Sequence, residues 1–148
     1  MQPSDQAISN MNAMNATAPE AQVRELLATW TKAVRDRDME GVLAHHSRDM
    51  VMFDLPPPEQ WRGMQKYRES WELFFKYFPH EGGLFEITEM DVTANGDLAY
   101  GYGILRCGSK DNSFPVRLTV CLRHIDAAWT IVHEHHSVPA PDTQNKPD

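Results

Sequence analysis

The sequence predicts one α+β domain: a conical fold in which N-terminal helices pack on a strongly bent, mostly antiparallel β-sheet. Apolar residues recur at helical spacing up to about residue 78 and alternate with polar residues after it. Short turn motifs separate the alternating segments, as in a meander of strands. Such a sheet must bury one face, and the N-terminal helices are its available partners. A cone of this kind leaves a cavity at its wide end.

Two or three helices are expected in the first half of the chain. The first begins at a capping box, Thr17-Ala-Pro-Glu20, and carries an apolar stripe from Val23 to Val34. A short second helix is expected over residues 39–45. The third follows Gly63, presents aromatic residues at helical spacing up to Phe78, and ends before a proline.

Strands are expected over residues 50–55, 98–107, 116–123 and 129–138, with a bulged strand before Asn95-Gly96. The bulge is expected because Phe85 and Ile87 are out of phase with Met90 and Val92, which indicates one extra residue. Polar or turn-forming residues at 108–112 and 126–128 separate the later strands.

Composition sets the domain organisation and excludes some functions. The expected division is a disordered leader over residues 1–16, one domain over 17–138 and a loose tail over 139–148. No segment has the pattern of a signal peptide or a membrane span, so we expect a cytoplasmic protein without membrane contact. The net charge of −7 and the scattered cations argue against nucleic acid as a partner. Cys107 and Cys121 are interpreted as small apolar residues in a reducing compartment, with one disulfide as the alternative.

Three segments carry a resemblance to a known family: WTKAVRDRDMEGVLAHHSRDMVMFDLPPP, WRGMQKYRESWELFF and AWTIVHEHHSVP. Their order resembles the nuclear-transport-factor-2-like superfamily, and particularly its SnoaL-like and ketosteroid-isomerase-like branches, over residues 20–138. The resemblance implies a cone that encloses a small apolar or aromatic organic molecule, without a cofactor. It also implies a homodimer formed through the outer face of the sheet. The fold hosts isomerases, cyclases, dehydratases and non-catalytic modules, so it does not define one activity.

Asp54 is the first candidate catalytic residue. It ends an apolar strand before three prolines, and by resemblance it falls where ketosteroid isomerases keep their general base. A carboxylate among apolar side chains is suited to acid–base work near neutral pH. The alternative is an aspartate that caps the turn through backbone amides. Trp30 and Val120 stand where those isomerases place their oxyanion donors, so a typical steroid isomerase is not predicted.

The string His133-Glu134-His135-His136 is the second candidate feature. Alternation on a strand places His133 and His135 on one face and Glu134 with His136 on the other. The resemblance implies that Glu134 and His136 face the cavity, with His136 opposite Asp54. Plain alternation would put Trp129 and Ile131 on the same face as His133.

Other interpretations of this string remain open at this stage. The histidines could be buried structural residues, or His133 and His135 could bind zinc or iron, although no third ligand is evident. We therefore predict no metal site. His45 and His46 are interpreted as surface residues.

The remaining candidate residues are expected to bind substrate. Beside the catalytic pair Asp54 and His136, the predicted lining consists of Trp30, Trp71, Phe75, Tyr102, Val120 and Glu134, and aromatic walls are typical of small-molecule pockets. The leading hypothesis is a cofactor-free isomerase, cyclase or dehydratase that transfers protons on a carbonyl-bearing substrate. The alternative hypothesis is a non-catalytic binding or oligomerisation module of the same fold.

Overall fold

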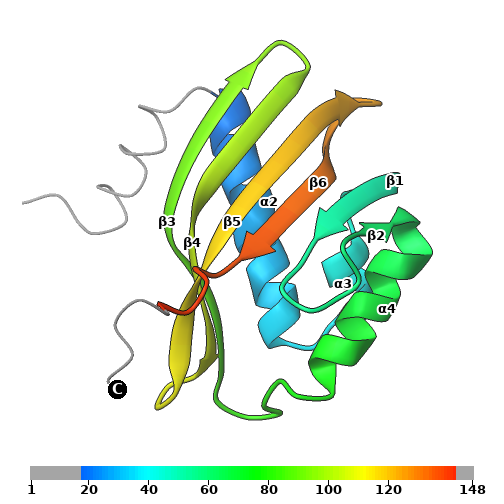
Figure 1. Cartoon of the computed structure of the whole chain (residues 1–148). Helices are drawn as coiled ribbons and strands as arrows, with labels where there is room; N and C mark the ends of the chain where they lie inside the picture. The colour runs from blue at the N-terminus through cyan, green and yellow to red at the C-terminus, as the bar shows by residue number, and fades with distance from the viewer. Residues whose placement is uncertain (1–17, 143–148) are drawn as a thin grey trace, which may run out of the picture.

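The structure is a computed structural model that describes residues 18–142. One six-stranded sheet has the order β2-β1-β6-β5-β4-β3, antiparallel throughout except for the parallel pair β1 and β6 (Figure 1). The elements in chain order are α2 (Ala18–Arg35), α3 (Met39–Leu43), β1 (His46–Phe53), β2 (Trp61–Arg62), α4 (Gly63–Phe75), β3 (Gly83–Asn95), β4 (Leu98–Ser109), β5 (Ser113–Ile125) and β6 (Ala128–Ser137). The predicted α+β class is confirmed: helices pack on an open, mixed sheet.

The long strands are connected by tight turns whose backbone suits their residues. Gly96 has a φ of 61°, and Asp126 and Ala127 have φ values of 50° and 66°. The turn predictions are confirmed at both places. The bulge in β3 is also confirmed, because the register between β3 and β4 shifts between Ile87 and Glu89.

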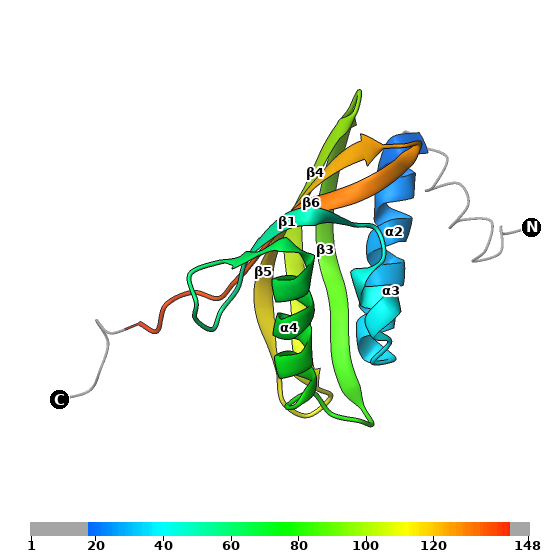
Figure 2. The ribbon, with the colours of Figure 1, turned by 90° about the vertical axis from the view of Figure 1, so that its right-hand side faces the viewer.

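Helix α2 packs on β3, and α4 packs on β1 and β2, so the helices enclose one face of the sheet. Figure 2 shows α2 and α3 together on one side of the strands. The core lies between these layers and consists mainly of aliphatic and aromatic side chains that are almost fully buried, including Val23, Leu27, Val34, Met50, Met52, Leu105, Leu118, Leu122 and Ile131. This apolar burial is the main force that holds the helices to the sheet.

Several predicted boundaries differ from the structure. The second helix ends at Leu43, and the third ends at Phe75 rather than near Phe78. The first strand begins at His46, four residues earlier than expected, because it pairs in parallel with β6 at Ile131. Parallel pairing with a distant strand is not visible in a local pattern.

Most of the predicted leader and tail lies outside the residues that the structure describes, so the predicted domain division stays a prediction. The proposed leader and Thr17 of the capping box lie outside the described residues, as do residues 143–148, and residues 139–142 form neither helix nor strand. Between residues 18 and 142, no helix has the length and apolar character needed to cross a membrane. Cys107 and Cys121 are both free thiols.

Candidate functional site

A cavity of about 470 Å³ opens between α4, the segment after β1, and strands β3 to β6. Its lining is mainly apolar: Met52, Leu55, Pro56, Trp61, Trp71, Leu73, Phe74, Tyr77, Phe78, Pro79, Phe85, Leu105, Phe114 and Val116, with Asp54, Ser70, Cys107, Gly108 and His136 as the other members. Asp54 and His136 are its only ionisable groups apart from the Cys107 thiol and the Tyr77 phenol, among the residues described. The size and character of this cavity suit a small organic molecule.

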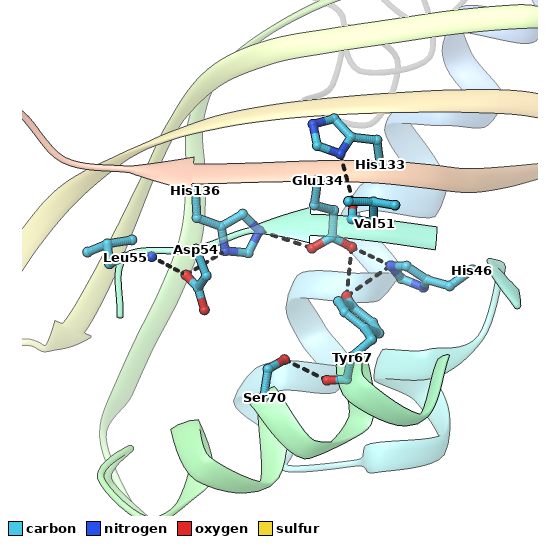
Figure 3. A network of polar contacts seen from close by, with 9 residues as sticks. All are labelled: His46, Val51, Asp54, Leu55, Tyr67, Ser70, His133, Glu134 and His136. Atoms are coloured by element: carbon cyan, nitrogen blue, oxygen red, sulfur yellow. Dashed lines mark hydrogen bonds and ion pairs between the residues drawn. The ribbon is translucent and has the colours of Figure 1, made fainter. Parts of the chain in front are cut away.

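Asp54 and His136 come together at the wall of this cavity (Figure 3). Asp54 directly follows β1, and His136 lies near the end of β6, its parallel neighbour. Nδ1 of His136 is 3.6 Å from Oδ1 of Asp54, with 8% of the histidine side chain and 22% of the aspartate side chain exposed. The same Oδ1 accepts a hydrogen bond of 2.8 Å from the Leu55 amide. The carboxylate is thus held by the backbone while it faces the imidazole.

Behind His136 lies a fully buried carboxylate, Glu134 (Figure 3). Its Oε1 is 3.0 Å from Nε2 of His136. Its Oε2 accepts a hydrogen bond of 2.6 Å from the Tyr67 hydroxyl and a second, short one from Nε2 of His46. Nδ1 of His46 in turn bonds the Ala44 carbonyl at 2.9 Å. Three side chains from three elements therefore satisfy one buried carboxylate.

Burial and charge act against each other in this group. Burial by itself would raise the pKa of Glu134, but the nearby His46 and the hydrogen bonds from both imidazoles bring it well below the usual range. Burial likewise pulls the pKa of His136 down, yet its hydrogen bond to Glu134 and the carboxylates of Glu134 and Asp54 raise it above its ordinary value. The pKa of the Tyr67 phenol is raised by burial and by the negative charge of Glu134.

His46 was predicted to lie on the surface, and this prediction is wrong. The side chain of His46 is fully buried against Glu134 and Tyr67. No local pattern marks His46 as buried, because Arg48, of the same parity on β1, is exposed and the pairing of β1 with β6 is irregular between His46 and Val51. Tyr67 belongs to the aromatic helical stripe that ends at Phe78. A tyrosine in such a stripe needs a partner for its hydroxyl, which points to a buried polar neighbour.

The last strand contains a bulge that its sequence pattern does not predict. Cys121 pairs with His133 and Leu122 pairs with Ile131, so Val132 has no partner in β5. The extra residue reverses the alternation, and Trp129 and Ile131 share the inner face with Glu134 and His136 rather than with His133. His133 bonds the Val51 carbonyl at 2.7 Å and His135 is exposed, so both lie on the outer face, as the resemblance implied.

The predicted lining residues occupy different places. Trp71 lines the cavity, and Trp30 lies beneath it, edge-on to both Trp71 and His136 with ring centroids at 6.0 and 6.1 Å. Phe75 does not line the cavity, because its position on α4 turns it toward Arg37, whose guanidinium lies 5.0 Å from the ring. Trp71, Phe74 and Phe78, three or four residues apart, line it instead.

Val120, Glu134 and Tyr102 also lie outside the cavity lining, although all three were predicted to belong to it. Glu134 shares the inner face with His136 but is fully buried behind it, so it does not reach the cavity. Val120 is fully buried in the core, opposite Glu134 on the neighbouring strand. Tyr102 is wrongly placed by the prediction: it is 53% exposed and stacks on Tyr100 on the outer face of β4. The reason is alternation, since Leu105 and Cys107 of the same strand point inward.

Within residues 18–142, no three His, Cys, Asp or Glu side chains are grouped as a metal site requires. The indole N–H groups of Trp30, Trp61 and Trp71 are buried and have no hydrogen-bond partner among those residues. Trp61 and Trp71 belong to the cavity wall. The wall therefore combines aromatic surface with two indole N–H groups that lack an acceptor among the described residues.

Solved structures with the same architecture define the class of protein. An NTF2-like protein of unknown function from Pseudomonas putida KT2440 is 34% identical, with a TM-score of 0.80, over 88% of this chain and 94% of that one. A candidate ketosteroid isomerase from Parabacteroides distasonis is 18% identical (TM-score 0.68; 82% and 89% covered). A candidate calcium/calmodulin-dependent protein kinase II association domain from Xanthomonas campestris is 20% identical (TM-score 0.68; 82% and 88%). The last two likenesses concern the fold alone.

The NTF2-like class can be narrowed by a family model. Residues 23–141 match the model of the SnoaL-like domain, which covers most of the chain. The chain therefore belongs to the SnoaL-like domain family, and the predicted membership of the NTF2-like superfamily is confirmed. A comparison with curated proteins found no match.

Proposed function

We propose that this protein is a cofactor-free enzyme that transfers a proton within a small, carbonyl-bearing organic substrate. The observation that carries the proposal is the pair at the cavity wall. An aspartate oxygen and an imidazole nitrogen stand 3.6 Å apart in an otherwise apolar cavity. That separation is too long for a direct hydrogen bond and leaves both groups available to a third.

The proposed chemistry assigns one role to each member of the pair. Asp54 takes the proton from the carbon next to the carbonyl, and the electrons of that C–H bond form an enolate. The enolate oxygen accepts a hydrogen bond from Nδ1–H of His136. Asp54 then returns the proton to another carbon, which completes an isomerisation. In a dehydratase it would instead give the proton to a departing β-hydroxyl group, which leaves as water.

The cavity wall supports a substrate that is uncharged and largely apolar or aromatic. Among the described residues that line it there is no lysine or arginine, and the carboxylate of Asp54 would repel an anion. The apolar walls, including Trp61, Trp71 and Phe74, would supply most of the binding free energy through buried area.

His136 also offers a hydrogen-bond donor for the enolate oxygen, which the residues at the family's donor positions do not. Trp30 and Val120 replace the two oxyanion donors of ketosteroid isomerases, and both are buried below or beside the cavity. His136 would then be the donor that takes their place, from a different strand. This difference favours a substrate other than the steroids of that enzyme class.

Two matched variants test the proposal. Once a screen of neutral aromatic ketones has found a substrate, Asp54→Asn and His136→Gln should each lower kcat by about a hundredfold or more, with KM less affected. Glu59→Gln, an exposed change in the segment after β1, serves as the control and should retain activity. Full turnover by Asp54→Asn or His136→Gln would refute the catalytic assignment.

One observation favours a non-catalytic binding module as the second candidate. The Leu55 amide already occupies Oδ1 of Asp54, as expected of an aspartate that stabilises its own turn. Such a module would bind the same neutral aromatic molecules without converting them. The predicted homodimer through the outer sheet face and the cytoplasmic location remain predictions beside either function.

A further inference from the structure

Glu134 is a costly residue to keep in this place. Its side chain has no exposure to solvent, and an apolar residue would fill the same volume without the expense of desolvating a charge. Hydrogen bonds from three donors on different elements offset this desolvation free energy: His136 on β6, Tyr67 on α4 and His46 at the start of β1. Packing alone does not explain why a charged carboxylate with three hydrogen-bond donors occupies this buried position.

The hydrogen bond between Glu134 and His136 indicates a second role for the carboxylate, which is to orient the imidazole. An ionised carboxylate can only accept, so Nε2 of His136, 3.0 Å from Oε1 of Glu134, carries a proton. This bond fixes the plane of the ring and turns Nδ1 toward Asp54 and the cavity (Figure 3). The Tyr67 hydroxyl and His46 hold the second oxygen and prevent the carboxylate from rotating away.

We infer that Glu134 is a positioning residue for the proposed proton transfer: it orients His136 and, through its negative charge, favours the imidazolium form, whose Nδ1–H can donate a hydrogen bond to the bound substrate. The inference rests on the proposed function and deepens it, because it assigns the two members of the pair opposite roles. His136 meets the substrate as a donor, and Asp54 meets it as the base.

The charges around His136 agree with this assignment. Glu134 faces the ring from the same strand and Asp54 from the segment after β1. Tyr67 and His46 reach it only through Glu134, Cys107 of β4 lies on the Asp54 side, and Trp30 contributes an uncharged face. His135, the next residue along the strand, points to the outer face, and burial and the neighbouring His133 and His136 lower its pKa. The two carboxylates outweigh burial and raise the pKa of His136, which favours the ring form that carries a proton on both nitrogens.

Nitrogen-15 NMR of the histidine rings tests the inference without any substrate. In the unaltered protein, His136, assigned by the loss of its signals in His136→Gln, should titrate above about pH 6.5 with Nε2 protonated throughout. In Glu134→Gln its midpoint should fall by about one to three pH units, since a carboxylate in direct contact is lost while burial remains. Glu40→Gln, an exposed change on α3, should leave the midpoint where it was.

The outcomes separate the inference from the proposed function. A neutral His136 below pH 6.5, or one that lacks a proton on Nε2, would overturn the inference even if Glu134→Gln failed to fold. An unchanged midpoint in a folded Glu134→Gln would also overturn it. If the NMR results hold, the high-pH limb of kcat/KM should shift down with the midpoint in Glu134→Gln. Full turnover by Asp54→Asn with those NMR results intact would refute the proposed function alone.

Discussion

The hydroxyl of Tyr67 offers the sharpest test of the buried group around Glu134. Tyr67→Phe removes one oxygen atom and leaves the ring, which lies 4.7 Å from His46 and 6.1 Å from Trp71 between centroids. The lost bond of 2.6 Å ends on a buried, charged acceptor. Hydrogen bonds to charged groups contribute about 1.5–3 kcal/mol. We therefore expect Tyr67→Phe to lower the free energy of unfolding by about 1.5–3 kcal/mol, since Glu134 Oε2 keeps only His46.

Urea denaturation followed by tryptophan fluorescence would measure this loss. Tyr102→Phe is a matched control, because its hydroxyl is 3.5 Å from Asp91 on the exposed outer face. A surface change of this kind should stay within about 0.5 kcal/mol. Tyr67→Phe in a Glu134→Gln background should cost less than it does alone, with a coupling energy of about 1 kcal/mol or more.

A cost of Tyr67→Phe no larger than that of Tyr102→Phe would refute a stabilising bond between Tyr67 and Glu134. Additive effects of the changes at Tyr67 and Glu134 would refute it as well. Either result would mean that the phenol does not stabilise the carboxylate in solution.

Three further predictions concern the same fold. Gly103→Ala should cost at least about 2 kcal/mol in urea unfolding, because a Cβ there would meet the Glu89 carbonyl oxygen at 1.9 Å; a cost under 0.5 kcal/mol would contradict this. Burial raises the pKa of the Cys107 thiol to about 11, so a thiol reagent should modify it slowly at pH 7.5, faster toward pH 10, and more slowly with a ligand in the cavity; equal rates at both pH values would be inconsistent. Because folding lowers the pKa of Glu134, its contribution to stability is present above about pH 4.3 and lost in acid, so Glu134→Gln should lose less stability than the unaltered protein between pH 5 and pH 3; equal losses in urea unfolding would contradict it.

Local patterns were sufficient for the elements of the fold other than the two-residue strand β2 (Trp61–Arg62). The apolar stripe of α2, the Asn95-Gly96 turn and the phase change between Ile87 and Met90 each concern residues close in sequence. Their physical causes, which are helical periodicity, turn conformation and one extra residue in a strand, act over a few residues. The same patterns together with the family resemblance brought Asp54 and His136 to attention before any distance was known.

The group around Glu134 was decided by tertiary structure. His46, Tyr67 and Glu134 come from β1, α4 and β6, and only the parallel pairing of β1 with β6 and the packing of α4 on β1 bring them together. The bulge at Val132 then determines that Glu134 and His136 face inward.

By itself, then, the sequence determined the α+β class and the order of the helices and of the strands other than β2. Those properties depend on short-range periodicity and on residue type. The choice of Asp54 and His136 also needed the family resemblance. The tertiary structure alone decided that His46 and Tyr67 belong to the site and that Tyr102 does not. A buried charge takes its partners from whatever side chains the fold brings within hydrogen-bond distance, and that distance is set by packing between elements far apart in the chain.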